Sequence, residues 1–351
     1  MKFQKNLLNS LFFILHMSNE VELISVIVGI ILALITTTCF NLAFVYQKKG
    51  LNQATVKGIE IKFEGGLKKI LKSFGWLFKN KAWMIGFSLG IIGWVPYVIS
   101  IGLVGIIVTE PVMATGFIVF VVAAIKILHE RVGILEYTAI GMLTISPVLI
   151  ALAGISDVDI DLYAFVPSYV IFLVIVVPIS IISLVIANKV RNEGLEGLLT
   201  MFGGAILFAL GGVATNILAQ ALIQTGEGFQ WYTILQLPFG IFWFIFSGTY
   251  AYLWVFLGFW LMGIFNISSV PFYQGGFQRG KLLIMYPILD TIALLLPIFA
   301  GLFVFQQSFT NYVLFFIALA FIIFGTIILS KYQIALETVE YKEELKQENV
   351  V

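Results

Sequence analysis

The sequence predicts an all-α polytopic membrane protein with nine transmembrane helices in two inverted repeats, a tenth helix being left open. Hydrophobic residues make up 60% of the 351 residues and charged residues only 11%, whereas soluble domains are typically about 45–50% apolar and about 25% charged. Apolar runs of about 20 residues recur along the chain, and each can cross the roughly 30 Å hydrocarbon layer. The single cysteine, Cys39, excludes an internal disulfide and a cysteine-cluster metal site.

The apolar runs place the expected spans in order along the chain. They lie near 22–47, 82–101, 104–127, 132–154, 163–188, 197–224, 281–304 and 310–330. The charge-free run 228–278 is harder to divide, because a helix of that length would reach roughly 77 Å. It breaks at Ser247-Gly248-Thr249, so it holds either two spans or one span and a segment in the membrane interface.

The basic residues decide between these two topologies. With one crossing near 252–277, every lysine and arginine except Lys2 and Lys5 falls on one side of the membrane. Since lysine and arginine favour the cytoplasm, we expect the N-terminus outside, the C-terminus in the cytoplasm and a location in the cell membrane. The aromatic stretch FQWYTILQLPFGIFWFIF then lies at the outer surface or re-enters from it.

Several segments are expected outside the spans. An extension covers 1–21, with Met17 as an alternative start, and a polar cytoplasmic tail covers 331–351. In the Lys-rich cytoplasmic loop 48–81, apolar residues at helical spacing indicate an amphipathic helix on anionic lipid, with topogenic charge as the alternative; these are Leu67, Ile70, Leu71, Phe74 and Leu77. The loop with Asp157, Asp159 and Asp161 is expected to be acidic and solvated, with a calcium site as the less favoured interpretation.

The chain also repeats itself. Pro111 is followed 19 residues later by Glu130, and Pro287 is followed 19 residues later by Gln306. Pro96 and Pro271 precede these prolines by similar distances. The repeats are 22–154 and 197–330, joined by a linking helix at 163–188. An offset of five spans inverts the second copy, which is a design of secondary transporters.

Here the sequence resembles a known family. FNLAFVYQKKGL resembles the end of the first helix of NIPA-type proteins, a branch associated with magnesium. VTEPVMATGFIVFVVAAIKILHERV and GGFQRGKLLIMYPILDTIALLLPIF resemble the two proline-bearing helices of the drug/metabolite transporter (EamA-like) superfamily. The resemblance implies a transporter of nine or ten helices in inverted halves. The chain differs from the NIPA branch at Trp94 and Gln274, where that branch has glutamate and asparagine.

Two carboxylates lie clearly inside the expected spans, Glu110 and Asp290. Each lies in the first turns of the repeated helix, beside Pro111 or Pro287, where proline loosens the backbone hydrogen bonds. A charged residue at membrane depth is costly and is a functional-site hypothesis by default. We expect the two to flank the midplane and to reach one cavity, as a proton-coupling or cation-coordinating pair, with interhelical packing as the alternative.

Other polar residues could line the same cavity, although packing is as good an explanation for them. These are Asn41, Gln47, Asn216 and Gln220, with Tyr97 and Tyr286 as weaker candidates. Glu130 and Arg131 are expected to form a capping ion pair where the third span ends, and the neighbouring His129 is expected to be solvated.

The sequence therefore predicts a secondary transporter or facilitator, moving a small metabolite by alternating access with proton coupling left open. Mg²⁺, held by Glu110 and Asp290, is the alternative substrate, and a non-transporting scaffold is the third interpretation. No catalytic constellation, cofactor motif or nucleic-acid signature is present, so we expect neither an enzyme nor a nucleic-acid partner. Membrane lipid is an expected partner, and a homodimer remains open.

Overall fold

The structure is a computed structural model that describes residues 2–61, 66–104, 112–113, 115–130, 133–154, 161–190, 192–226 and 233–348. Within these ranges the chain is helical and contains no strand. It divides into two compact units. Unit 1 consists of Met1–Gly50 and Asn80–His129, and unit 2 consists of Leu51–Lys79 and Glu130–Val351.

Six helices in the described part are long and apolar enough to cross a membrane, so the chain is an integral membrane protein of the polytopic α-helical class. These segments are Val26–Val56 of α1, α7 (Val166–Ala187), α8 (Glu193–Gln224), α11 (Tyr250–Arg279), α12 (Leu282–Phe303) and Tyr312–Leu329 of α13 (Tyr312–Glu348). Proline lies inside α7, α11 and α12, as membrane helices tolerate.

Three further predicted spans are covered in different degrees. Helices α3 (Lys81–Val104) and α6 (Ile134–Ala153) match the spans predicted at 82–101 and 132–154. The span predicted at 104–127 is only partly described, because residues 105–111 and 114 lie outside the described ranges. Its visible portion is α5 (Phe117–Ala123), which continues as a π-helical turn over Ala124–Leu128.

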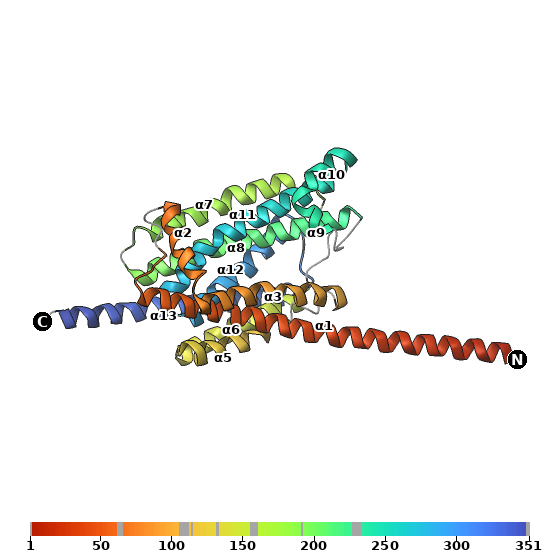
Figure 1. Ribbon diagram of the computed structural model, residues 1–351, viewed down its shortest axis with the longest axis horizontal. Coiled ribbons are helices and arrows are strands. Elements are labelled where there is room, and N and C mark those ends of the chain that lie inside the picture. Colours follow the sequence, from red (N-terminus) through yellow and green to blue (C-terminus); the bar gives the residue numbers. More distant parts are fainter. Residues whose placement is uncertain are drawn as a thin grey trace. The chain divides into compact units, whose positions relative to one another are not determined.

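Helix α1 is longer than the sequence predicted. It runs unbroken from Lys2 to Val56 (Figure 1), so it continues through 48–56, the first part of the predicted Lys-rich loop, and residues 2–21 of the predicted extension belong to the same helix. Packing extends it past the apolar run, because Lys48 and Leu51 are both buried. Gly50 permits a close approach there, since a Cβ on it would lie 2.6 Å from Trp83 Cβ.

In unit 1, α1 and α3 pack as an antiparallel pair. A Cβ on Gly86 would lie 2.5 Å from the Ala43 carbonyl oxygen, and a Cβ on Gly93 would lie 2.8 Å from the Phe40 ring. Further along, Ser100 Oγ donates a hydrogen bond of 2.9 Å to the Gly29 carbonyl. Small residues thus let the two backbones approach, as is common between membrane helices.

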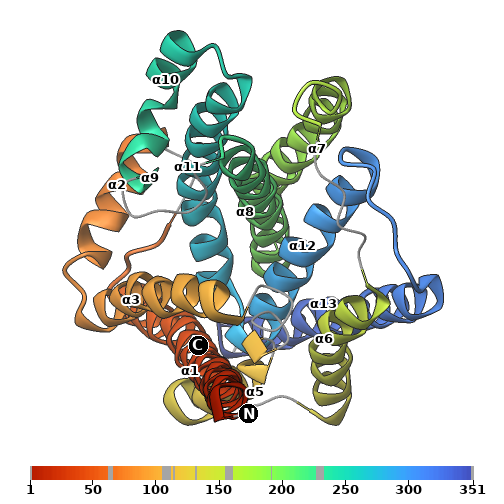
Figure 2. The ribbon, with the colours of Figure 1, turned by 90° about the vertical axis from the view of Figure 1, so that its right-hand side faces the viewer.

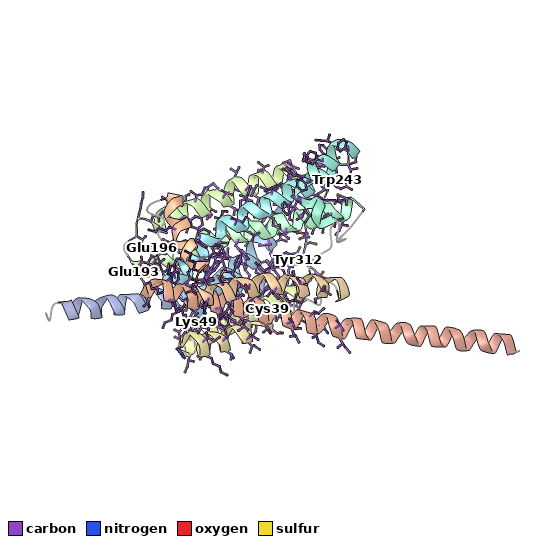
Figure 3. All side chains as sticks on the ribbon, viewed as in Figure 1. Cys39, Lys49, Glu193, Glu196, Trp243 and Tyr312 are labelled. Atoms are coloured by element: carbon purple, nitrogen blue, oxygen red, sulfur yellow. The ribbon has the colours of Figure 1, made fainter. Side chains whose placement is uncertain are left out.

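In unit 2, α8 is the central helix, and α7, α11 and α12 pack against it (Figure 2). Helix α6 packs against α13, and their ends are joined where the Thr310 and Asn311 amides donate to the carbonyls of Gly154 and Ala153. Figure 3 places Trp243 at one end of this unit and Glu193 and Glu196 at the other. We call these the Trp243 end and the Glu196 end.

The antiparallel contact of α8 with α11 settles the course of the charge-free run. Gly258 lies against Leu218, and Gly197 lies against Arg279, so the chain between the two helices starts and finishes at the Trp243 end. That connection contains α9 (Thr233–Gln236), the 3₁₀ turn η2 (Leu237–Phe239) and α10 (Gly240–Ser247).

Helix α10 has 8 residues, roughly 12 Å, which is too short to cross the membrane. The predicted division at Ser247-Gly248-Thr249 is confirmed, because α10 ends at Ser247 and Gly248 adopts a left-handed conformation with φ of 68°. Phe246 is 87% exposed at this end, which suits an aromatic segment in the membrane interface.

Candidate functional site

Of the predicted pair Glu110 and Asp290, the structure describes only Asp290. Glu110 and Pro111 lie outside the described ranges, so their proximity to Asp290 stays a prediction. Asp157 and Asp159 also lie outside them. Among the described residues, no group of three histidine, cysteine, aspartate or glutamate side chains is placed to hold a metal ion.

Asp290 occupies an unusual position on α12. The preceding residues of this helix, 282–289, are all buried, and Pro287 is among them. Asp290 itself is exposed, and the next residue, Thr291, is buried again. At 1.5 Å per residue the carboxyl lies about 12 Å along the helix from its start. The protein therefore leaves one carboxylate uncovered within an apolar span.

A compact polar cluster surrounds Asn41 on α1. The Asn41 Nδ2 donates to the Thr37 carbonyl at 2.8 Å and to Thr37 Oγ1 at 3.1 Å. Thr37 Oγ1 in turn donates to the Met113 carbonyl at 2.6 Å, and Gly116 lies directly against it. Asn41 Oδ1 is buried and accepts no hydrogen bond in the structure, which leaves an acceptor open beside the chain that follows Glu110.

The other predicted site residues are dispersed. Gln47 is buried where α1 meets Gly86, and Tyr97 is half-buried between the rings of Phe40 and Trp94. Asn216 and Gln220 are half-buried on α8, whereas Gln274 is fully buried on α11.

The sequence analysis singled out Glu110 and Asp290 and did not consider Glu136. Glu136, in the first turn of α6, falls within the predicted span 132–154 and is buried. A Cβ on Gly133 would lie 2.5 Å from its Oε2, so the side chain folds back over the helix start. Glu136 is the third residue of α6. The helix dipole favours acidic side chains in the first turn, so this position could have been recognised from the sequence as a helix start.

Sequence reasoning also missed Asn266 of α11. Its side chain fills the space over Gly211 of α8, and its Nδ2 donates to the Met262 carbonyl at 2.9 Å. An asparagine in the middle of an apolar helix was a signal for interhelical contact.

Glu130 has a role that the sequence analysis did not predict. Its two carboxylate oxygens accept hydrogen bonds from the Leu282 and Leu283 amides at 2.8 and 2.9 Å. It therefore caps the first turn of α12, where unpaired N–H groups and the helix dipole favour an anion. The proposed partner Arg131 lies outside the described residues, and His129 is exposed as predicted.

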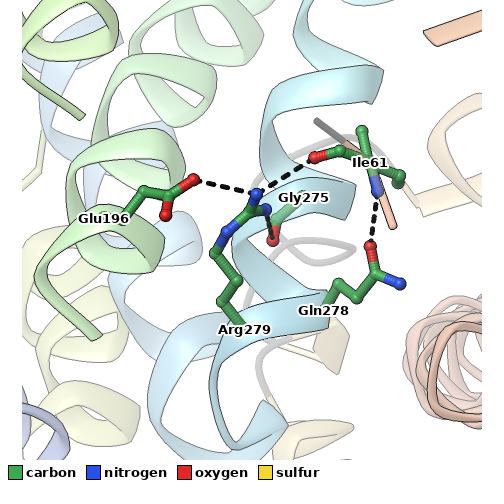
Figure 4. A network of polar contacts seen from close by, with 5 residues as sticks. All are labelled: Ile61, Glu196, Gly275, Gln278 and Arg279. Carbon is green, nitrogen blue, oxygen red and sulfur yellow. Dashed lines mark hydrogen bonds and ion pairs between the residues drawn. The ribbon is translucent and has the colours of Figure 1, made fainter. Parts of the chain in front are cut away.

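The Glu196 end carries a second polar network (Figure 4). Arg279, in the last turn of α11, forms an ion pair of 2.8 Å with Glu196 of α8. Its Nη2 also donates to the Ile61 carbonyl at 3.2 Å, and the Ile61 amide donates to Gln278 Oε1 at 2.9 Å. Residues from the Lys-rich loop are thereby fixed to the end of α11.

The amphipathic helix predicted in that loop is present as α2 (Gly66–Leu77), but its apolar side does not simply face lipid. Leu77 is only 1% exposed, and Ser73 Oγ donates to the Glu60 carbonyl. Lys72 and Lys79 are exposed. Protein thus covers part of the stripe that was expected to bind anionic lipid.

The acidic loop before α7 also has a local structural role. Asp161 Oδ1 accepts hydrogen bonds from the amides of Tyr163 and Ala164 at 2.8 and 3.1 Å. These two bonds lower the pKa of the Asp161 carboxyl below its ordinary value.

In comparisons with known proteins, no family model matches this chain, and neither a curated protein nor a solved structure is significantly similar to it.

Proposed function

We propose that the protein is a secondary transporter or facilitator that moves a small polar metabolite across the membrane by alternating access. The observation that carries the proposal is Asp290, a carboxylate that protein does not cover in the middle of an apolar span. A carboxylate facing lipid is costly, so such residues face a water-filled path and act on a substrate or proton. Asn41, with its open buried acceptor, is the second candidate contact.

Backbone geometry supports the internal repeat on which alternating access depends. In the described part of the chain, only His129 and Gln306 combine a side chain with positive φ, 58° and 55°. They follow Pro111 and Pro287 by 18 and 19 residues, so a left-handed residue comes at nearly the same distance after each proline. This agreement favours two inverted repeats, nine spans and membership of the drug/metabolite transporter superfamily.

Mg²⁺ is the alternative substrate. Mg²⁺ keeps several waters and needs only one or two protein carboxylates, so Asp290, with Glu110, is a sufficient ligand set. Uptake into proteoliposomes distinguishes the two. One set of vesicles contains a fluorescent Mg²⁺ indicator, and a second is offered radiolabelled amino acids, nucleosides and sugars, each with and without a proton gradient.

Asp290→Asn is the decisive variant, because it keeps the shape of the side chain and removes its charge. We expect the transported solute to enter at least about tenfold more slowly while the melting temperature is retained. Asp161→Asn, which removes the same charge outside the spans, is the matched control and should transport normally. Equal rates for Asp290→Asn and wild type would refute the role of Asp290, and no uptake of any solute by wild type would favour a scaffold.

The proposed orientation has its own test. In a Cys39→Ser background, cysteines at Lys57 and Lys342 should be shielded from an impermeant thiol reagent in intact cells, whereas one at Asp159 should react. Reaction at Lys342 from outside would reverse the assignment of the C-terminus to the cytoplasm.

A further inference from the structure

The segment from Thr55 to Ile61, which we call the strap, leaves the end of α1 and crosses the Glu196 end of unit 2. Beyond Val56 it has no regular secondary structure. Nevertheless, Ile61 is only 1% exposed, whereas Val56, five residues earlier, is 89% exposed. Something other than helix or sheet hydrogen bonding therefore holds the second half of the strap in place.

Gln278 holds the strap at three points. Its Oε1 accepts from the Ile61 amide at 2.9 Å, and its Nε2 donates to the Ile59 carbonyl at 2.8 Å and to Thr55 Oγ1 at 2.9 Å. Both ends of the amide are thus used on the strap. An amide side chain that pairs with a backbone N–H and a backbone C=O replaces the neighbouring strand that this segment lacks.

Arg279 of α11 connects the strap to α8. Its guanidinium bonds the Ile61 carbonyl, pairs with Glu196 of α8 and reaches the Gly275 carbonyl at 3.1 Å (Figure 4). One side chain thereby ties α8, α11 and the strap together. The side chains of this ion pair are 12% and 24% exposed, so the pair is screened less than a surface salt bridge.

Helix α2 is joined to the same strap. Ser73 Oγ donates to the Glu60 carbonyl at 3.0 Å, and Lys57 Nζ lies 5.4 Å from the centre of the Trp76 ring. The strap and α2 are therefore held to each other as well as to α11. A movement of the strap would carry α2, with its exposed Lys72, along with it.

We infer that the strap is a closing device, which Gln278 and Arg279 hold over the Glu196 end and which opens as a unit with α2. Its contacts with α11 are side-chain hydrogen bonds from Gln278 and from Arg279, which also pairs with Glu196. Local opening breaks such contacts without unfolding the helices. It closes over the junction between α11 and α12, the helix that carries Asp290. Its part in a transport cycle rests on the proposed function, whereas its opening does not.

The test uses thiol labelling of the full-length protein in detergent, in a Cys39→Ser background. A cysteine at Val56 should react at once with a maleimide, because that position is exposed in the closed strap. A cysteine at Ile61 should react slowly but completely while the protein stays folded. Adding Gln278→Ala should speed the reaction at Ile61 about tenfold and leave Val56 unchanged, because three hydrogen bonds to the strap are lost. Ile267→Ala, an exposed site elsewhere on α11, is the control and should change neither.

Two variants separate the ion pair from the bond to the strap. Arg279→Met removes both the ion pair and the hydrogen bond to the Ile61 carbonyl, whereas Glu196→Gln removes only the ion pair. Arg279→Met should therefore speed labelling at Ile61 more than Glu196→Gln does. Two outcomes would overturn the inference. Either Ile61 reacts as fast as Val56 in the parent protein, so the strap is not closed, or Ile61 reacts only after thermal unfolding, so the strap does not open. Neither outcome depends on whether a transported solute has been found.

Discussion

The helix pair α1–α3 of unit 1 and the pair α8–α11 of unit 2 both pack through glycines on each helix, but these glycines meet different kinds of atoms. In α1–α3, Gly86 of α3 meets the backbone of α1, and Gly50 of α1 meets the Cβ and backbone nitrogen of Trp83 on α3. In α8–α11, Gly211 meets a side chain, that of Asn266. The most apolar window of α8 is 56% buried against 33% for α1.

The difference concerns where polar groups are placed. On α1, Thr36, Thr37 and Asn41 are buried, whereas on α8, Asn216 and Gln220 are only half-buried. The more enclosed helix thus has a buried face formed mainly by small and aliphatic residues, and the less enclosed one hides a polar cluster. In a helix whose other side faces lipid, buried polar groups bind either a neighbouring segment or a ligand.

The largest expected effect comes from filling the backbone contacts. A Cβ on Gly86 would lie 2.7 Å from the Gln47 amide nitrogen, and a Cβ on Gly204 would lie 2.7 Å from that of Tyr273. Because backbone cannot rotate away, we expect Gly86→Ala and Gly204→Ala each to destabilise the fold by about 1–3 kcal/mol. Denaturation in detergent measures this.

Gly263→Ala is the matched control, since nothing lies within 4 Å of a Cβ there. It should be neutral or stabilise by about 0.5–1 kcal/mol, because alanine is the better helix former. If Gly86→Ala behaves like Gly263→Ala, the close α1–α3 contact is absent in solution.

A smaller effect is expected at Gly211. A Cβ there would lie 2.7 Å from Asn266 Cγ, and a side chain can turn aside where a backbone cannot. Gly211→Ala should therefore cost less than Gly204→Ala, and adding Asn266→Ala should recover most of the loss. A double-mutant cycle of melting temperatures measures the coupling. Strictly additive effects would mean that the two residues do not touch.

The smallest effect concerns how helix starts respond to pH. Asn192 caps α8 by accepting from the Leu195 amide, and an amide does not titrate. Asp161, before α7, has a pKa lowered from 3.8 by two backbone hydrogen bonds. Its contribution is therefore present above the unfolded pKa and is lost as the pH falls through the lower folded value. Wild type should therefore melt at a slightly higher temperature than Asp161→Asn at pH 7, and this advantage should disappear as the pH falls below about 4. An equal acid response of both proteins would assign the loss to other carboxylates.

The spans could be predicted because runs of apolar residues are local and each must be about 20 residues long. The break at Gly248 was equally local. The end of α1 was not predictable, because Lys-Lys-Gly resembles a loop until Trp83 of α3 is seen beside Gly50. Glu130 was assigned to its sequence neighbour Arg131, whereas its partners, Leu282 and Leu283, are more than 150 residues away.

The candidate site shows the same limit. Asp290 could be singled out by charge alone, but its exposure beside buried residues depends on the helices that pack against α12. The open acceptor of Asn41 depends on Thr37, one turn away, and on Met113, far along the chain. Local patterns select the residue types, and tertiary contacts decide which side chains are buried and which are exposed.

Gln278 and Arg279 form hydrogen bonds with the main chain of the strap, at the Ile59 and Ile61 carbonyls and the Ile61 amide. Main-chain atoms are the same whichever amino acid carries them. Apart from the Thr55 hydroxyl, which Gln278 also contacts, the specificity of this contact is therefore encoded on α11, and residues 59 and 60 can change in composition without loss of fit. Position 61 needs only an apolar side chain, whereas replacing Gln278 by any residue that cannot both donate and accept breaks the match. Replacing residues 59 and 60 by those of another loop would therefore keep the contact, whereas replacing α11 by another helix would lose it.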